Sequence, residues 1–176
     1  MNRLVDSTRI DDQLLFRLHR LVAVASAPVI RLCEGRHGIT RREWGLIATL
    51  AQHGPQRSSD LAALAGLDRA RTSRAIAPLQ AKGLIERVAA AGDRRQVILH
   101  LTPAGRDVFE ALCPDVVHIN RALTAVLGAD DARTFDRCLD RLLDRALQLQ
   151  ATRRVGPKAQ RRLGAHRRRL VVEPGH

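Results

Sequence analysis

The stretch from Arg69 to Ala77 combines arginines with small side chains at helical spacing. On a helical wheel of about 100° per residue, the small and basic positions gather on one face. These outward positions are Ala70, Ser73, Arg74 and Ala77. Alanine permits close approach to a groove, serine can donate or accept a hydrogen bond, and arginine can contact guanine through two hydrogen bonds. Such a face is typical of a helix that lies in the major groove of DNA, and a solvated, charged helix face is the alternative.

The opposite face of this helix is predicted to pack into a core, through Thr72, Ala75, Ile76 and Leu79. Asp68 is placed to cap the N-terminus, and Arg69 and Arg71 flank the outward face, where they would reach DNA phosphates. Pro78 lacks the N–H that would bond to the Arg74 carbonyl. We therefore expect either a bend in the second half of the helix or an earlier end, and the sequence leaves both open.

A second arginine pair stands in the stretch GDRRQ, residues 92–96, where glycine and aspartate signal a turn. Arg94 and Arg95 would then lie at the tip of a β-hairpin. The negative potential of the narrow minor groove attracts arginine, so a hairpin laid along DNA would bind there. Asp93 would support the tip by accepting hydrogen bonds or by pairing with Arg95. A polar hairpin turn without a ligand is the alternative.

Three helices and a hairpin must position these residues. The predicted elements are a helix over residues 40–53, a short helix capped by Ser58 or Ser59 and ending at Gly66, a helix over residues 69–82, and strands over 84–88 and 96–101. The first helix opens with the capping box TRRE, and alternating apolar residues mark the strands. Two helices joined by a tight turn and followed by a hairpin predict a winged helix.

Three flanking helices carry more apolar surface than this winged helix can cover. They are expected over residues 7–33 with a bend at Pro28, over residues 102–127 after the start signal Thr102-Pro103, and over residues 130–149. Dimerisation through them would bury the excess apolar surface. The expected fold class is mostly α with a small β-hairpin wing.

This organisation divides the chain into four segments. They are an N-terminal dimerisation helix (1–39), the winged helix-turn-helix (40–102), the C-terminal dimerisation helices (103–150) and an Arg-rich tail (151–176) that we expect to be disordered. Residues 153–176 hold 8 of the 30 Lys and Arg residues and one acid, so much of the net charge of +12 lies in the tail. A basic RNA-associated protein acting through this tail is an alternative, although few aromatic residues are available to stack on bases.

Several other classes of protein lack support. No HExxH, GxSxG, phosphate-binding loop or dinucleotide-binding motif is present, so we expect neither an enzyme nor a cofactor. Cys33, Cys113 and Cys138 lack the spacing of a disulfide framework or a metal site, so no metal is expected. The acidic N-terminus and the lack of a long apolar run argue against a signal peptide and a membrane span, and predict a cytoplasmic protein.

The stretch from Thr40 to Gly105 resembles the MarR family of bacterial transcription regulators. The resemblance is most specific in GDRRQVILHLTPAG, through Asp93, Arg95, Leu101, Thr102 and Gly105. It implies a homodimer, expected to be a repressor, that binds a palindromic operator in double-stranded DNA. It also implies that Ser73 and Arg74 occupy recognition-helix positions and that Asp93 supports the wing arginine Arg95. Pro78 departs from the usual family pattern.

The resemblance further implies a small effector that releases the protein from DNA. Family effectors are commonly phenolic or aromatic acids, sometimes their thioesters, bound between the dimer helices and the winged lobe. Candidates on the first two helices are His19, Arg20, Arg31 and Trp44, although a tryptophan there is more often part of the core. Some relatives sense oxidants through a cysteine, which makes Cys33 a second sensor candidate. Buried, inert thiols at all three cysteines are the alternative that we favour.

Overall fold

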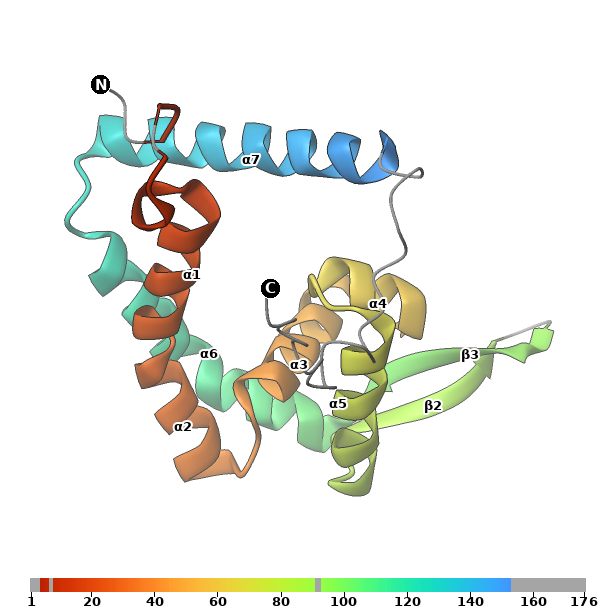
Figure 1. Cartoon of the computed structure of the whole chain (residues 1–176). Coiled ribbons are helices and arrows are strands. Elements are labelled where there is room, and N and C mark those ends of the chain that lie inside the picture. Colours follow the sequence, from red (N-terminus) through yellow and green to blue (C-terminus); the bar gives the residue numbers. More distant parts are fainter. Residues whose placement is uncertain (1–3, 7, 91–92, 153–176) are drawn as a thin grey trace, which may run out of the picture. The chain divides into compact units, whose positions relative to one another are not determined.

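A computed structural model describes residues 4–6, 8–90 and 93–152, which are mostly helical with one small antiparallel sheet (Figure 1). The fold class expected from the sequence is confirmed. These residues form two compact units, divided between Val126 and Leu127. The Arg-rich tail lies outside the described residues, except that Ala151 and Thr152, which the sequence placed in the tail, belong to the last helix.

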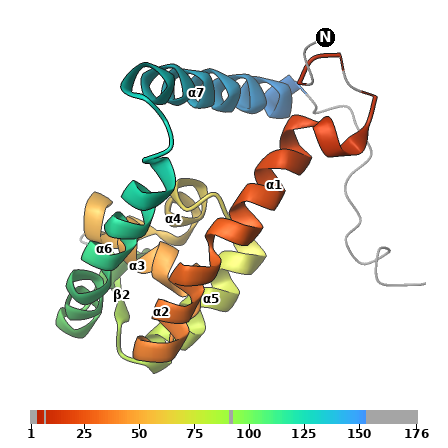
Figure 2. The same ribbon diagram turned by 90° about the vertical axis from the view of Figure 1, so that its left-hand side faces the viewer.

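The N-terminal region forms a short 3-10 helix, η1 (Ile10–Asp12), followed by α1 (Leu14–Ala25) and α2 (Ala27–His37). The single bent helix predicted over residues 7–33 is wrong, because the chain is interrupted at Ser26 and the second helix continues to His37. Pro28 lies in the first turn of α2, where its missing N–H removes no bond within that helix. Figure 2 shows α1 and α2 following one another along nearly one line.

The winged helix contains α3 (Arg41–His53), α4 (Ser58–Leu64) and α5 (Arg69–Ala81). The predicted capping box is confirmed, because the Glu43 amide donates to Thr40 Oγ1 at 3.2 Å and the Thr40 amide donates to Glu43 Oε2 at 2.6 Å. The predicted cap of the short helix is wrong. Ser58 and Ser59 both lie inside α4, and the residue before it, Arg57, makes no side-chain cap bond.

The sheet has the strand order β1 (Gln56–Arg57), β3 (Asp93–Leu101), β2 (Ile85–Ala90), and both pairings are antiparallel. The predicted hairpin of β2 and β3 is confirmed, with Ile85 opposite Leu101 and an irregularity between Ala89 and Ala90. The two-residue β1 was not predicted. The hairpin strands also extend further toward the tip than expected, since Asp93 already belongs to β3.

The long helix α6 (Pro103–Thr124) packs against α2 and α3 and completes the core of the first unit. Thr102 caps it, with its Oγ1 accepting the Gly105 amide at 3.0 Å. The helix ends at Thr124, short of the predicted Leu127. The fully buried core side chains include Leu46, Ile47, Leu50, Leu61, Ile76, Leu79, Leu99 and Leu112.

The second unit contains α7 (Ala129–Thr152). Asp130 and Asp131 lie in its first turn, where carboxylates interact favourably with the helix dipole. Apolar side chains form an exposed stripe along α7, which includes Phe135, Leu139, Leu142, Leu143, Leu147 and Leu149. Within the described part of its own unit, no other element covers this stripe.

Candidate nucleic-acid interface

The two faces of α5 are as the sequence predicts. The buried side consists of Thr72, Ala75, Ile76 and Leu79, and the exposed side includes Ala70, Ser73, Arg74 and Ala77. Thr72 Oγ1 donates to the Asp68 carbonyl at 3.0 Å, so the hydroxyl on the buried face is satisfied within the helix. Core packing therefore sets which side of α5 faces outward.

The arginines of α5 have different partners. Asp68 caps the helix by accepting the Arg71 amide at 2.9 Å, and its carboxylate also pairs with Arg71 Nε at 3.3 Å. Arg74 Nε instead donates to the carbonyl of Ala70 at 3.2 Å. Part of the positive charge of Arg71 is thus compensated by a carboxylate, whereas the partner of Arg74 is a neutral backbone group.

Pro78 lies inside α5, with an exposed side chain, and the helix continues beyond it to Ala81. The earlier end that the sequence left open is therefore excluded. Because proline has no N–H, the carbonyl of Arg74 loses its usual helical donor.

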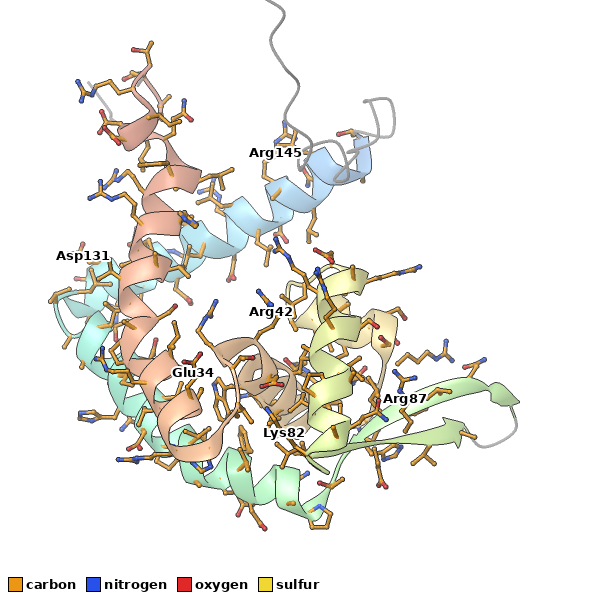
Figure 3. The ribbon with its side chains drawn as sticks, turned by 60° about the horizontal axis from the view of Figure 1, so that its bottom comes forward. Glu34, Arg42, Lys82, Arg87, Asp131 and Arg145 are labelled. Atoms are coloured by element: carbon orange, nitrogen blue, oxygen red, sulfur yellow. The ribbon has the colours of Figure 1, made fainter. Side chains whose placement is uncertain are left out.

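The hairpin of β2 and β3 extends away from the helices (Figure 1). The backbone of Asp93, Arg94 and Arg95 belongs to β3, and the expected support of Arg95 by Asp93 concerns side chains outside the described part of the structure. Arg87, exposed on β2 (Figure 3), is a further basic residue of the hairpin that the sequence analysis missed. The sequence could have indicated Arg87, because it is a basic residue on the predicted strand that leads to the hairpin tip.

A cleft of about 510 Å³ lies between α2, the start of α3 and the turn before α5, and is named here the polar cleft. It is lined by Ile30, Glu34, Thr40, Arg41, Arg42, Gly45, Ala65, Gly66, Leu67 and Arg71. Figure 3 marks Glu34 on α2 and Arg42 on α3. Three arginines face one glutamate across this space, so the polar cleft has an excess of positive charge.

A second cleft of about 430 Å³, named here the apolar cleft, adjoins it. Its lining comes from α1, α2, α3 and α6, and comprises Leu21, Val22, Ala25, Ser26, Val29, Arg41, Trp44, Gly45, Val116 and Leu123. Arg41 and Gly45 line both clefts. An apolar wall with one arginine suits an aromatic ring that carries an acidic group.

The four effector candidates from the sequence do not gather at one place. Trp44 lines the apolar cleft, is 7% exposed and stacks on Phe109 of α6 with ring centroids 5.7 Å apart, so it also belongs to the core. Arg20 and Arg31 line two separate depressions, and His19 is exposed on α1. Arg41 lines the apolar cleft beside Trp44 instead. In the sequence, Arg41 is only an inner residue of the capping box, which does not indicate a ligand contact.

Cys33 is fully buried, as expected. Burial raises the pKa of its thiol above the ordinary value of 9.0, the charge of Glu34 adds to the rise, and Arg41 opposes it. The expectation of burial is wrong for Cys138, which is exposed on α7, and Cys113 is half-buried. A raised pKa and a lack of exposure are the opposite of what a thiol-based sensor requires.

Two other kinds of site are absent from the part of the chain that the structure describes. None of its helices combines the length and the hydropathy needed to cross a lipid bilayer. No three His, Cys, Asp or Glu side chains there are grouped so that they could hold a metal ion.

Known proteins similar to this chain are transcription regulators. Residues 37–96 match the model of the MarR family. The chain is 28% identical over 130 residues to the putative transcriptional regulatory protein for the hcr operon of Thauera aromatica, covering 74% of this chain and 78% of that protein. The solved structure of a probable transcriptional regulator from Pseudomonas aeruginosa is 30% identical to this chain, with a TM-score of 0.66. The match covers 76% of this chain and 99% of the Pseudomonas protein.

BpsR of Bordetella bronchiseptica, whose DNA binding is regulated by 6-hydroxynicotinic acid, has the same fold. It is 21% identical to this chain, with a TM-score of 0.69, and the match covers 78% of this chain and 98% of BpsR. The family consists of regulators and not of enzymes. Together with the winged helix, the match to the family model and the 30% identity to the Pseudomonas aeruginosa regulator show that the chain belongs to the MarR family of transcriptional regulators.

Proposed function

We propose that this protein is a homodimeric repressor that binds a palindromic DNA operator and is released from it by a small effector. The observation that carries the proposal is α5, whose exposed face joins small residues to arginines while its opposite face is buried in the core. Two such helices in a symmetric dimer would enter major grooves, and the hairpins would reach the adjacent minor grooves. The protein would act in the cytoplasm, in contact with the chromosome.

Each part of this interface has its own role in the proposal. Ser73 and Arg74 would contact base edges, and Ala70 would allow the helix to approach them. Sequence-independent attraction and minor-groove contacts would come from Arg69, Arg71, Arg94 and Arg95. Selection of bound fragments from a random-sequence DNA pool tests this directly. The protein should enrich an inverted repeat with half-sites about 10 bp apart or a multiple of that spacing, and enrichment of RNA from a matched pool would instead favour the RNA-associated alternative.

Dimerisation is proposed to use α1, the end of α6 and α7. Leu15 and Val24 of α1 are 79% and 76% exposed, and Val126 is 86% exposed. With the exposed stripe of α7, these side chains are the apolar surface that the proposed dimer would bury. Light scattering at micromolar concentration should therefore give the mass of a dimer, and the mass of a monomer would contradict the proposal.

The effector is proposed to be an aromatic acid or its thioester, bound in the apolar cleft. The proposal is supported by Trp44 and Arg41, which line this cleft, and by the response of the similar protein BpsR to 6-hydroxynicotinic acid. Trp44 is the single tryptophan of the chain, so its fluorescence reports on a ring bound beside it. A panel of aromatic acids and their thioesters should include a compound that changes this fluorescence saturably and weakens operator binding over the same concentration range.

Arg41→Gln tests whether Arg41 binds the acidic group of the effector. The substitution should weaken binding of the active acid while leaving binding of its uncharged amide unchanged, because only the acid gains from the arginine charge. Equal losses for the acid and the amide would contradict the role of Arg41.

A further inference from the structure

A single lysine connects the end of α5 with the ends of two other helices. The ammonium of Lys82, the residue directly after α5, donates to the Gly38 carbonyl at 2.7 Å. It also lies 3.1 Å from Oε2 and 3.3 Å from Oε1 of Glu43. Gly38 ends α2 and Glu43 lies in the first turn of α3, so one ammonium joins three helices. Figure 3 shows Lys82 where the end of α5 lies beside the end of α2.

The partner of Lys82 is a buried charge. The Glu43 side chain is 4% exposed, and its Oε2 also accepts the Thr40 amide at 2.6 Å. The Lys82 side chain is itself 36% exposed, so the pair is half-buried, but removing the ammonium would leave the buried carboxylate of Glu43 without a compensating charge. Arg36 of α2 and Asp115 of α6 form an exposed ion pair, with N and O atoms 2.9 Å apart, which serves as a comparison.

The contacts between α5 and the core depend less on direction than the hydrogen bonds of Lys82 do. They are made mainly by the apolar side chains of Ala75, Ile76 and Leu79. Apolar burial has no preferred direction, whereas hydrogen bonds weaken steeply when their geometry is disturbed. The bonds of Lys82 therefore add a directional contact at the C-terminal end of α5, whose outward face is set by the core.

We propose that Lys82 is a positioning residue for base reading. In this role it does not contact DNA, and it holds α5 where Ser73 and Arg74 meet the base edges. The inference rests on the proposed function. Base contacts require side chains held within about 0.5 Å of their working geometry. Attraction to phosphates falls slowly with distance, so it tolerates a looser helix.

Lys82→Met tests this role because it keeps an unbranched apolar side chain and removes the ammonium. The DNA fragment selected by the parent protein and a random fragment of equal length serve as probes, at several salt concentrations. We expect Lys82→Met to weaken binding of the selected fragment about tenfold, while random-DNA affinity and the salt slope stay those of the parent. Lys82→Arg keeps the positive charge, so it should bind the selected fragment more tightly than Lys82→Met does.

Two further variants separate positioning from other roles. Arg36→Met removes one positive charge and an exposed ion pair from α2 without touching α5, so it should leave specific affinity unchanged. Glu43→Gln removes the charge that Lys82 faces and should reproduce the loss of specific affinity. Combining it with Lys82→Met should add little, because both changes break the same contact. Glu43→Gln and Lys82→Arg also provide the test if Lys82→Met does not fold.

Other results would overturn the inference. A folded Lys82→Met that loses affinity for both DNAs equally and has a salt slope lower by about one would make Lys82 a phosphate contact. A lower melting temperature with unchanged specific affinity would make it a purely structural residue. If the parent protein selects no DNA sequence, the proposed function itself is overturned. If the parent selects a sequence and the Lys82 variants bind it as tightly as the parent, only the role of Lys82 is overturned.

Discussion

The hydroxyl of Thr102 donates a hydrogen bond of 2.7 Å to the carbonyl of Gly83, 19 residues earlier in the chain. The same oxygen accepts the Gly105 amide at 3.0 Å, and the Thr102 amide donates to the Leu84 carbonyl at 3.1 Å. One residue therefore joins the turn that follows α5 to the first turn of α6. This arrangement gives a physical reason for the Leu-Thr-x-x-Gly pattern at the end of β3.

Gly105→Ala should strongly destabilise the protein. A methyl group there would lie 2.1 Å from the Leu84 carbonyl oxygen and 2.7 Å from Leu101 Cδ1. The Leu84 carbonyl accepts the Thr102 amide at 3.1 Å, so the backbone of Leu84 cannot move without disturbing the start of α6. We therefore expect the free energy of unfolding to fall by about 3 kcal/mol, measured by urea denaturation. Gly35→Ala is the control, since the added methyl group would meet no atom within 4 Å beyond its own stretch of helix backbone. It should leave stability unchanged or raise it by up to about 1 kcal/mol. Similar small effects for both variants would contradict this account.

Arg74→Ala and Arg71→Ala should affect DNA binding differently. The first should relax the preference at one base position by about 1–3 kcal/mol, because it removes a base contact. The second should weaken binding to all sequences and lower the salt slope by about one or less, since Asp68 already compensates part of the Arg71 charge. Binding to the selected operator, to its single-base variants and to random DNA gives both quantities. An equal loss on all these DNAs for Arg74→Ala would refute base reading by this residue.

Arg95→Ala should weaken operator binding and leave the dimer folded. Its backbone belongs to β3 where that strand adjoins the hairpin turn, and we expect no loss of core packing from a substitution there. Gel-shift titration at physiological salt measures the affinity, and thermal unfolding with light scattering checks fold and mass. A variant that binds as tightly as the parent would show that the hairpin does not contact DNA through this residue.

Cys33 should make stability depend on pH above the ordinary pKa of a thiol. Burial and Glu34 raise the pKa of Cys33 in the folded protein, so the unfolded chain releases this proton first. The contribution of the thiol is therefore complete below its ordinary value of 9.0 and declines as the pH rises above it. As the pH rises above about 9, the free energy of unfolding should fall more steeply for the parent than for Cys33→Ala. Identical slopes would mean that the thiol titrates alike in both states.

The sequence predicted those features whose signals are local. The capping box at Thr40 and Glu43 needs only residues within one helical turn, and the two faces of α5 follow from helical periodicity. The hairpin is likewise marked by alternating residues around a glycine. These are also the elements that position the candidate DNA contacts, so this site could be predicted in outline.

Features that depend on distant contacts could not be predicted in the same way. β1 exists because Gln56 and Arg57 pair with β3, and two residues carry no periodicity of their own. The effector candidates were chosen by their helix alone, and a helix presents side chains in all directions, so Arg20 and Arg31 lie in depressions apart from Trp44. The bridge from Lys82 to Gly38 spans 44 residues and has no sequence signature.

The helix α2 lines both clefts and ends at the carbonyl that Lys82 holds. A ligand that displaces α2 would therefore act on α5 through a direct bond. Linkage makes such an effect reciprocal, because the factor by which an effector weakens operator binding equals the factor by which that operator weakens effector binding. Tighter operators would then require more effector before they are vacated. Under the proposed function, the operators would be vacated in a fixed order, weakest first, as the effector accumulates.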